Sequence, residues 1–301
     1  MAEAGKKSLF LRLYDRMMNY ALGLLTKPVK RYTLHVPNDL DALKRHIRKG
    51  DVVLVEGNER VSECIKYLTQ SCWSHSALYV GDEPIRRDPA SKAALVEQFG
   101  DDAEFLVVEA LVEKGVVLSP LAKYGKFNIR ICRPFNISSA DLAEVMDEVL
   151  RSVGETYDIR NIIDLTRYFL PVTLVPARWR RKALEFGSGE PTKVMCSSLI
   201  AEAFQRVRFP IVPHYEPLPE GAIPAAASKR MLWPIGSRTT GAIRLGTLRM
   251  VSPTLITPRD FDLSPYFEIV KFNMIEGARF DYRKIRWAED TPPAAQIKKG
   301  A

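Results

Sequence analysis

Short strand-like stretches fill the middle of this chain, and a helix with a cysteine in its first turn follows them. The stretches alternate polar and apolar residues or stay apolar for several positions, and Gly81-Asp82 and Gly115 supply turns between them. They read KGDVVLVEG, SHSALYVGD, EFLVVEAL, GVVLSPL and NIRICRP. The pattern predicts strands that pack against helices.

Helical patterning marks other parts of the chain. A short helix is expected within 38–49, capped by Asn38 or Asp39, and another over RVSECIKYLTQ. Residues 138–153, opened by Ser138 or Ser139, and residues from about 194 to 207 have the period of amphipathic helices. Residues 208–250 are rich in proline and glycine and are expected to be loop, and a strand is expected near residue 270.

These elements suggest one domain over residues 31–285, with an amphipathic helix before it in residues 1–30 and a disordered tail over 286–301. Residues 161–190 mix apolar, aromatic and basic side chains with three prolines. They are interpreted as an inserted lid-like segment, or as a buried connection with a solvated basic face.

Residues 7–26 read KSLFLRLYDRMMNYALGLLT and have a broad apolar face with a narrow polar arc. The helix either docks on the body of the protein or lies on an anionic membrane surface through its basic residues. No apolar run of about 18 residues is present, and charges interrupt the N-terminal stretch where a signal peptide would be apolar. We expect a cytoplasmic protein that is peripheral to the membrane if this helix binds lipid.

The net charge of +8 is compatible with nucleic acid, anionic lipid or an acidic partner. No nucleic-acid motif accompanies it, so no nucleic-acid partner is expected. The four cysteines show no paired spacing and suggest reduced thiols. The spacing of Cys64, Cys72 and His75 matches no common zinc pattern, so neither a metal nor another cofactor is expected.

Cys196, in KVMCSSLIAEAFQRV, is the candidate nucleophile because a thiol in the first turn of a helix faces unpaired N–H groups and the positive end of the helix dipole. A cysteine hydrolase also needs an imidazole and a polar group to orient it. His75 in SHSALYV and Glu109 in FLVVEAL suit these roles, because each lies in an expected strand, and the buried carboxylate would need a partner. Tyr157 in GETYD could bind the oxyanion, beside the N–H of Cys196, or shape the pocket.

The stretches GDVVLVEG, WSHSALYVGD, VVEALVEKGVVLSPL, GETYD and VMCSSLIAEAF resemble, in this order, the circularly permuted papain-like hydrolases of the NlpC superfamily. The YiiX/YebB-like group is most similar, and lecithin–retinol acyltransferase-type enzymes are more distant. The order of histidine and glutamate before cysteine carries the resemblance. It implies an α+β fold in which a small antiparallel sheet or half-barrel packs on the helix of Cys196, with His75 as base and acid, Glu109 as orienter and Tyr157 near the pocket.

We expect a cysteine hydrolase that cleaves an amide or ester through an acyl-thioester, on a small-molecule, peptide or lipid substrate. An acyltransferase with the same triad and a catalytically silent, membrane-associated binding module are the alternatives. Fold does not choose among them.

Overall fold

The computed structural model describes residues 27–28, 32–35, 38–111, 114–155, 195–217 and 246–272. Helices and strands alternate along it. The α-helices are α2 (Leu40–His46), α3 (Arg60–Thr69), α4 (Glu83–Arg87), α5 (Lys92–Phe99), α6 (Ser139–Arg151), α9 (Met195–Arg206) and α10 (Pro258–Leu263). The strands are β1 (Val52–Val55), β2 (His75–Gly81), β3 (Leu106–Leu111), β4 (Gly115–Pro120), β5 (Ile129–Pro134), β6 (His214–Pro217), β7 (Gly246–Arg249) and β8 (Phe267–Val270). Short 3-10 helices are η1 (Pro89–Ser91), η2 (Gly100–Asp102), η3 (Leu121–Lys126) and η6 (Pro253–Leu255).

A six-stranded sheet in the order β4-β3-β2-β1-β5-β8 organises the protein. Each neighbouring pair in it is antiparallel. Gly115 turns β3 into β4 with a φ of 71°, a left-handed conformation that glycine adopts without strain. The α+β fold with an antiparallel sheet packed on the Cys196 helix is confirmed, and each strand-like stretch of the sequence forms a strand.

Local capping sets the helix boundaries that the sequence suggested. Asp39, not Asn38, caps α2 by accepting from two backbone N–H groups, and Ser138 caps α6 by accepting from Asp141 N at 3.0 Å. The helix α3 ends where Gln70 turns left-handed with a φ of 52°. The ends of α2 and α3 precede the loops that lead into β1 and β2.

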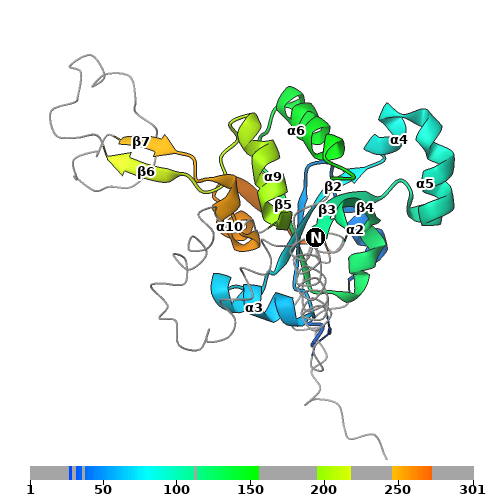
Figure 1. Ribbon diagram of the computed structural model, residues 1–301, viewed down its shortest axis with the longest axis horizontal. Helices are drawn as coiled ribbons and strands as arrows, with labels where there is room; N and C mark the ends of the chain where they lie inside the picture. The colour runs from blue at the N-terminus through cyan, green and yellow to red at the C-terminus, as the bar shows by residue number, and fades with distance from the viewer. Residues whose placement is uncertain are drawn as a thin grey trace, which may run out of the picture.

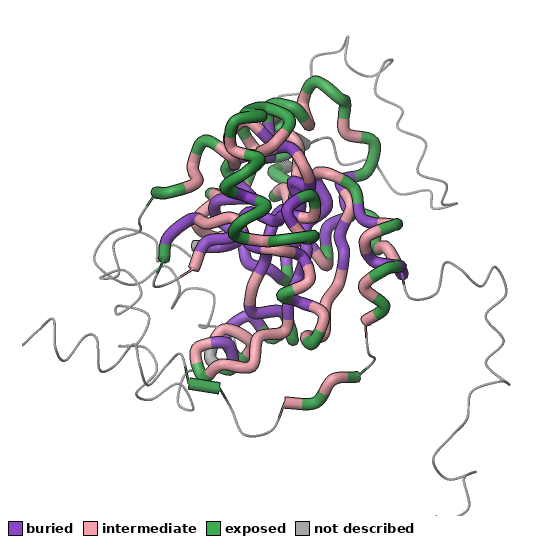
Figure 2. Tube along the Cα trace, turned by 90° about the vertical axis from the view of Figure 1, so that its right-hand side faces the viewer, coloured by how far each residue is buried: buried purple, intermediate pink, exposed green. Residues whose placement is uncertain are grey.

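The two faces of the sheet are covered differently (Figure 1). Because side chains alternate along a strand, Leu54 and Leu78 face the layer of α6, α9 and α10, while Val53 and Ala77 face α2 and η3. The helical layer contributes the larger apolar cluster, and the buried part of the chain runs through the sheet between both layers (Figure 2). At about 25 cal/mol per Å² of buried apolar surface, this two-sided burial is the main stabilising contribution.

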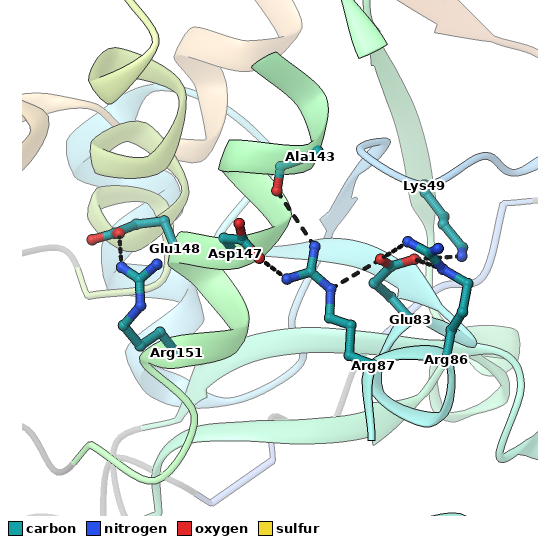
Figure 3. Close-up of polar contacts among 8 residues, drawn as sticks. All are labelled: Lys49, Glu83, Arg86, Arg87, Ala143, Asp147, Glu148 and Arg151. Carbon is teal, nitrogen blue, oxygen red and sulfur yellow. Dashed lines mark hydrogen bonds and ion pairs between the residues drawn. The ribbon is translucent and has the colours of Figure 1, made fainter. Parts of the chain in front are cut away.

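An ionic cluster ties α4 to the helical layer (Figure 3). The buried carboxylate of Glu83 accepts from Lys49 Nζ at 2.6 Å, from Arg87 Nε at 2.9 Å and from Arg86. Arg87 also pairs with Asp147 on α6. The hydrogen bonds from Arg86, together with Lys49 and Arg87, lower the pKa of Glu83 to about 2 against the effect of burial. The cluster is structural, because each carboxylate in it already has its cation.

The expectation for residues 208–250 was wrong. Residues 208–250, expected as loop, include a two-stranded sheet of β6 and β7, which extends away from the body of the protein (Figure 1). The pairing places Tyr215 opposite Leu248, and the prolines and glycines around these strands hid their β-type signal. The short helix α10 was also missed, although Thr257 and Asp260 form a capping box around Pro258.

Several expectations lie outside the described residues: the amphipathic helix over 7–26, Tyr157, the segment 161–190 and the tail over 286–301. Within the described ranges, none of the helices has the length and apolar character needed to cross a bilayer.

Candidate functional site

Two neighbouring strands bring His75 and Glu109 together. His75 is the first residue of β2, and Glu109 lies within β3, which pairs with β2 through Leu78 and Val108. Strand alternation then puts both side chains on the sheet face that η3 covers. His75 Nε2 lies 2.8 Å from Glu109 Oε2, and the Glu109 side chain is fully buried.

The 3-10 helix η3 adds two residues that the sequence reasoning missed. Tyr124 donates its hydroxyl to Glu109 Oε2 at 2.5 Å and lies 3.2 Å from His75 Nε2. Lys123 donates to Glu109 Oε1 at 2.5 Å. The sequence offered one signal, a lysine and a tyrosine side by side directly after a strand paired with the strand of Glu109. That spacing alone did not show that η3 folds back onto the sheet.

Cys196 approaches this group from the helical layer. It is the second residue of α9, a helix that packs on β2 and β3, and it is 7% exposed. Its thiol interacts with the His75 imidazole by hydrogen bond and by charge. The thiol also lies at the positive end of α9, as the sequence predicted.

The histidine therefore bridges the thiol and the carboxylate. Because Nε2 of His75 donates to Glu109, its Nδ1 is the ring nitrogen left for Cys196. The carboxylate fixes this tautomer and the orientation of the ring. The structure thus brings together Cys196, His75 and Glu109, the three residues on which the sequence argument rested.

The charges of this group shift one another strongly. Burial alone lowers the pKa of His75, but the Cys196 thiolate and Glu109 outweigh it and raise that pKa to about 10. Burial raises the pKa of Glu109, but His75 and Lys123 outweigh it and hold that pKa well below its usual value. Burial and the neighbouring Glu109 keep the pKa of Tyr124 well above its usual value, so it remains a donor. The site favours an imidazolium between two anions.

Cys196 differs from the other thiols whose side chains the structure describes. Burial raises its pKa, but the charge and hydrogen bond of His75 outweigh burial, and the pKa is lowered. Burial raises the pKa of Cys132 to about 12 and also raises that of the exposed Cys72. Cys196 is therefore the thiol that the fold activates among these three.

Ser76 follows His75 and lies beside the sulfur. Its backbone N–H and its hydroxyl both lower the pKa of Cys196. The buried hydroxyl forms no hydrogen bond of ordinary geometry among the described residues, so it acts on the sulfur as a nearby dipole. We assign the larger stabilisation of the thiolate to the backbone N–H.

No group of three or more His, Cys, Asp or Glu residues suited to a metal ion occurs in the described part of the chain. Tyr157, the predicted pocket residue, lies outside it.

A helix-borne thiol with a lowered pKa, facing a histidine that a buried glutamate orients, is the arrangement of a papain-like cysteine hydrolase. The model of the permuted papain-like amidase family YaeF/YiiX, C92, matches residues 46–169. The match confirms the resemblance to circularly permuted papain-like enzymes and indicates an amidase or peptidase of the cysteine type. The matched range includes His75, Glu109 and Tyr124 and ends before Cys196, so the thiol is placed by geometry.

A matching solved structure is the crystal structure of metalloprotein yiiX from Escherichia coli O157:H7, DUF1105. It is 15% identical, with 74% of this chain and 96% of that chain covered and a TM-score of 0.39. No curated protein matches this sequence. The NlpC superfamily name remains an interpretation of the sequence motifs.

Proposed function

We propose that the protein hydrolyses an amide acyl bond through a thioester on Cys196, with His75 as acid and base and Glu109 as the residue that orients it. The observation that carries the proposal is the geometry: Glu109 Oε2 holds His75 Nε2 at 2.8 Å, and Cys196 at the start of α9 interacts with the same imidazole. The family description of a permuted papain-like amidase supports an amide substrate.

The reaction follows from the resting ion pair. The Cys196 thiolate attacks the carbonyl carbon, and the bond from sulfur to carbon forms as the negative charge moves to the carbonyl oxygen. The carbon–nitrogen bond then breaks, and the departing amine takes the proton from the His75 imidazolium. Water next gives a proton to His75 and attacks the thioester, which releases the acid and regenerates the thiolate.

The backbone N–H of Cys196, at the start of α9, is a donor for the oxyanion in this scheme. Tyr157 is the second candidate, on the sequence argument alone. Glu109 stays ionised throughout, because three donors surround it.

The test is acylation by p-nitrophenyl acetate together with alkylation by iodoacetamide. Wild-type protein should release a burst of nitrophenolate and carry one acetyl group on Cys196 by peptide mass spectrometry. Cys196→Ala should lose the burst and the label, whereas Cys72→Ala, which removes the exposed thiol, should keep both. A full burst from Cys196→Ala contradicts the proposed nucleophile.

The alternative of acyl transfer uses the same thioester, with a second nucleophile in place of water. Product analysis with and without an added amine acceptor separates the two, because a transferase forms the new amide in preference to the free acid. The apolar and basic pattern of residues 7–26 supports a substrate at an anionic membrane surface. Sedimentation with anionic liposomes tests this, and unchanged binding after removal of residues 1–27 contradicts it.

A further inference from the structure

The carboxylate of Glu109 receives more cationic charge than is needed to orient His75. Its Oε2 serves His75 at 2.8 Å and Tyr124 at 2.5 Å. Its Oε1 accepts a separate bond from Lys123 Nζ at 2.5 Å. The Glu109 side chain is fully buried, while that of Lys123 is 36% exposed. The positive charge of Lys123 therefore contacts the buried carboxylate from the solvent side.

A buried carboxylate beside an imidazolium has two opposed effects. It orients the ring, and it also makes the ring hold its proton more tightly. The His75 proton must leave during the proposed reaction, because an amine departs only after it is protonated. Glu109 with a full, uncompensated charge would therefore slow this step.

Lys123 opposes that effect. Its ammonium lies on the oxygen that His75 does not use, so it reduces the negative field at the ring without competing for Oε2. Tyr124 cannot do the same, because it is a neutral donor on the oxygen shared with His75.

Resting on the proposed function, we propose that Lys123 is a positioning residue that acts through Glu109 and sets how readily His75 gives its proton to a leaving amine. The charge of Lys123, rather than its bulk, performs this role. Lys126 offers a matched control, because it lies in the same 3-10 helix, is exposed, and forms no ion pair with Glu109 among the described contacts.

The first measurement requires no substrate. The titration of the His75 imidazole is followed by NMR in histidine-labelled full-length protein, with the resonance assigned by its loss in His75→Gln. Lys123→Met should move the titration midpoint of His75 upward, since the field of Glu109 is no longer offset. Lys123→Arg and Lys126→Met should leave the midpoint close to wild type.

The second measurement compares one acyl group carried as a p-nitrophenyl ester and as a p-nitroanilide. Nitrophenolate can leave as an anion, whereas nitroaniline must receive a proton from His75 before it leaves. Lys123→Met should therefore slow cleavage of the anilide about three- to tenfold and leave cleavage of the ester unchanged. Lys123→Arg should restore the anilide rate.

Two results overturn the inference. An unmoved His75 midpoint in Lys123→Met shows that Lys123 does not act through Glu109. An equal loss on ester and anilide with no change in midpoint shows that Lys123 only supports the local fold. Failure of the proposed function can be distinguished from failure of this inference. It appears in wild-type protein as the absence of acetylation at Cys196, independently of any shift in the His75 midpoint.

Discussion

Two buried carboxylates in this fold, Asp51 and Glu109, differ in the chemical groups that donate to them. Asp51 precedes β1 and is held by Arg133 through Nε and Nη2 at 2.8 and 2.7 Å, with Arg48 N at 2.8 Å. Glu109 is held by Lys123, Tyr124 and His75. A guanidinium keeps its proton, whereas an imidazolium can pass its proton to a leaving group during a reaction.

The two pKa shifts run in opposite directions. Burial raises the pKa of Asp51 in spite of Arg133, whereas His75 and Lys123 outweigh burial and lower that of Glu109. The two carboxylates are similarly buried, so their partners decide the role of each. Asp51 stabilises the fold, whereas Glu109 shifts the pKa of His75. We therefore expect variants at Asp51 and its partner to change stability, and variants at Glu109 to change turnover.

The largest effect is expected for Glu109→Gln. The amide keeps the shape but loses the charge that fixes the tautomer and supports the imidazolium, so acylation of Cys196 should fall about 10³- to 10⁴-fold. Stopped-flow release of nitrophenolate measures it. Asp51→Asn is the control and should leave acylation per folded molecule unchanged; equal losses in the two variants would remove the distinction between the carboxylates.

The next effect concerns stability. Arg133→Met leaves the Asp51 carboxylate buried without its cation and should lower the free energy of unfolding by about 3–5 kcal/mol. Urea denaturation measures it. Arg130→Met, on the same strand, removes a partly exposed partner of Asp262 and should cost less, about 1 kcal/mol or below. A similar cost for both variants would show that the burial of Asp51 does not decide the outcome.

A third prediction extends the comparison to thiols. Iodoacetamide at neutral pH should modify Cys196 faster than Cys72, although Cys72 is the more exposed, because His75 lowers the pKa of Cys196 and burial raises that of Cys72. As pH falls, the rate for Cys72 should drop about tenfold per unit, and that for Cys196 should drop less. Peptide mass spectrometry follows both sites. His75→Gln should remove the preference, and a faster Cys72 in wild type would refute it.

The smallest effect is in acid. The folded pKa of Glu109 lies below its ordinary value of 4.5, so its contribution is complete above pH 4.5 and is lost as pH falls through the folded pKa. The stability advantage of wild type over Glu109→Gln should therefore shrink in acid. Asp51, whose pKa is raised from 3.8, should show the opposite sign against Asp51→Asn. Urea midpoints at neutral and acid pH test both, and parallel curves would contradict the opposed shifts.

The sequence predicted much of the site because each residue carried a local signal. Cys196 stood at a helix start, and His75 and Glu109 stood in patterned strands, so chemistry and position agreed. The signal for Lys123 and Tyr124 was too weak to single them out, since a basic and an aromatic residue side by side after a strand are common on any surface. The pairing of β6 with β7 was missed because prolines and glycines hid the strand signal and because propensity does not report pairings between strands that are far apart in the chain.

By itself, then, the sequence determined the five central strands, the helix that carries Cys196 and the choice of three candidate site residues, because these depend on periodicity, capping and residue type. Only the tertiary structure decided that β2 lies beside β3, that η3 folds onto Glu109 and that α9 brings Cys196 to His75. The physical reason is that a pKa depends on burial and on charges a few ångströms away, and those distances exist only in the folded chain.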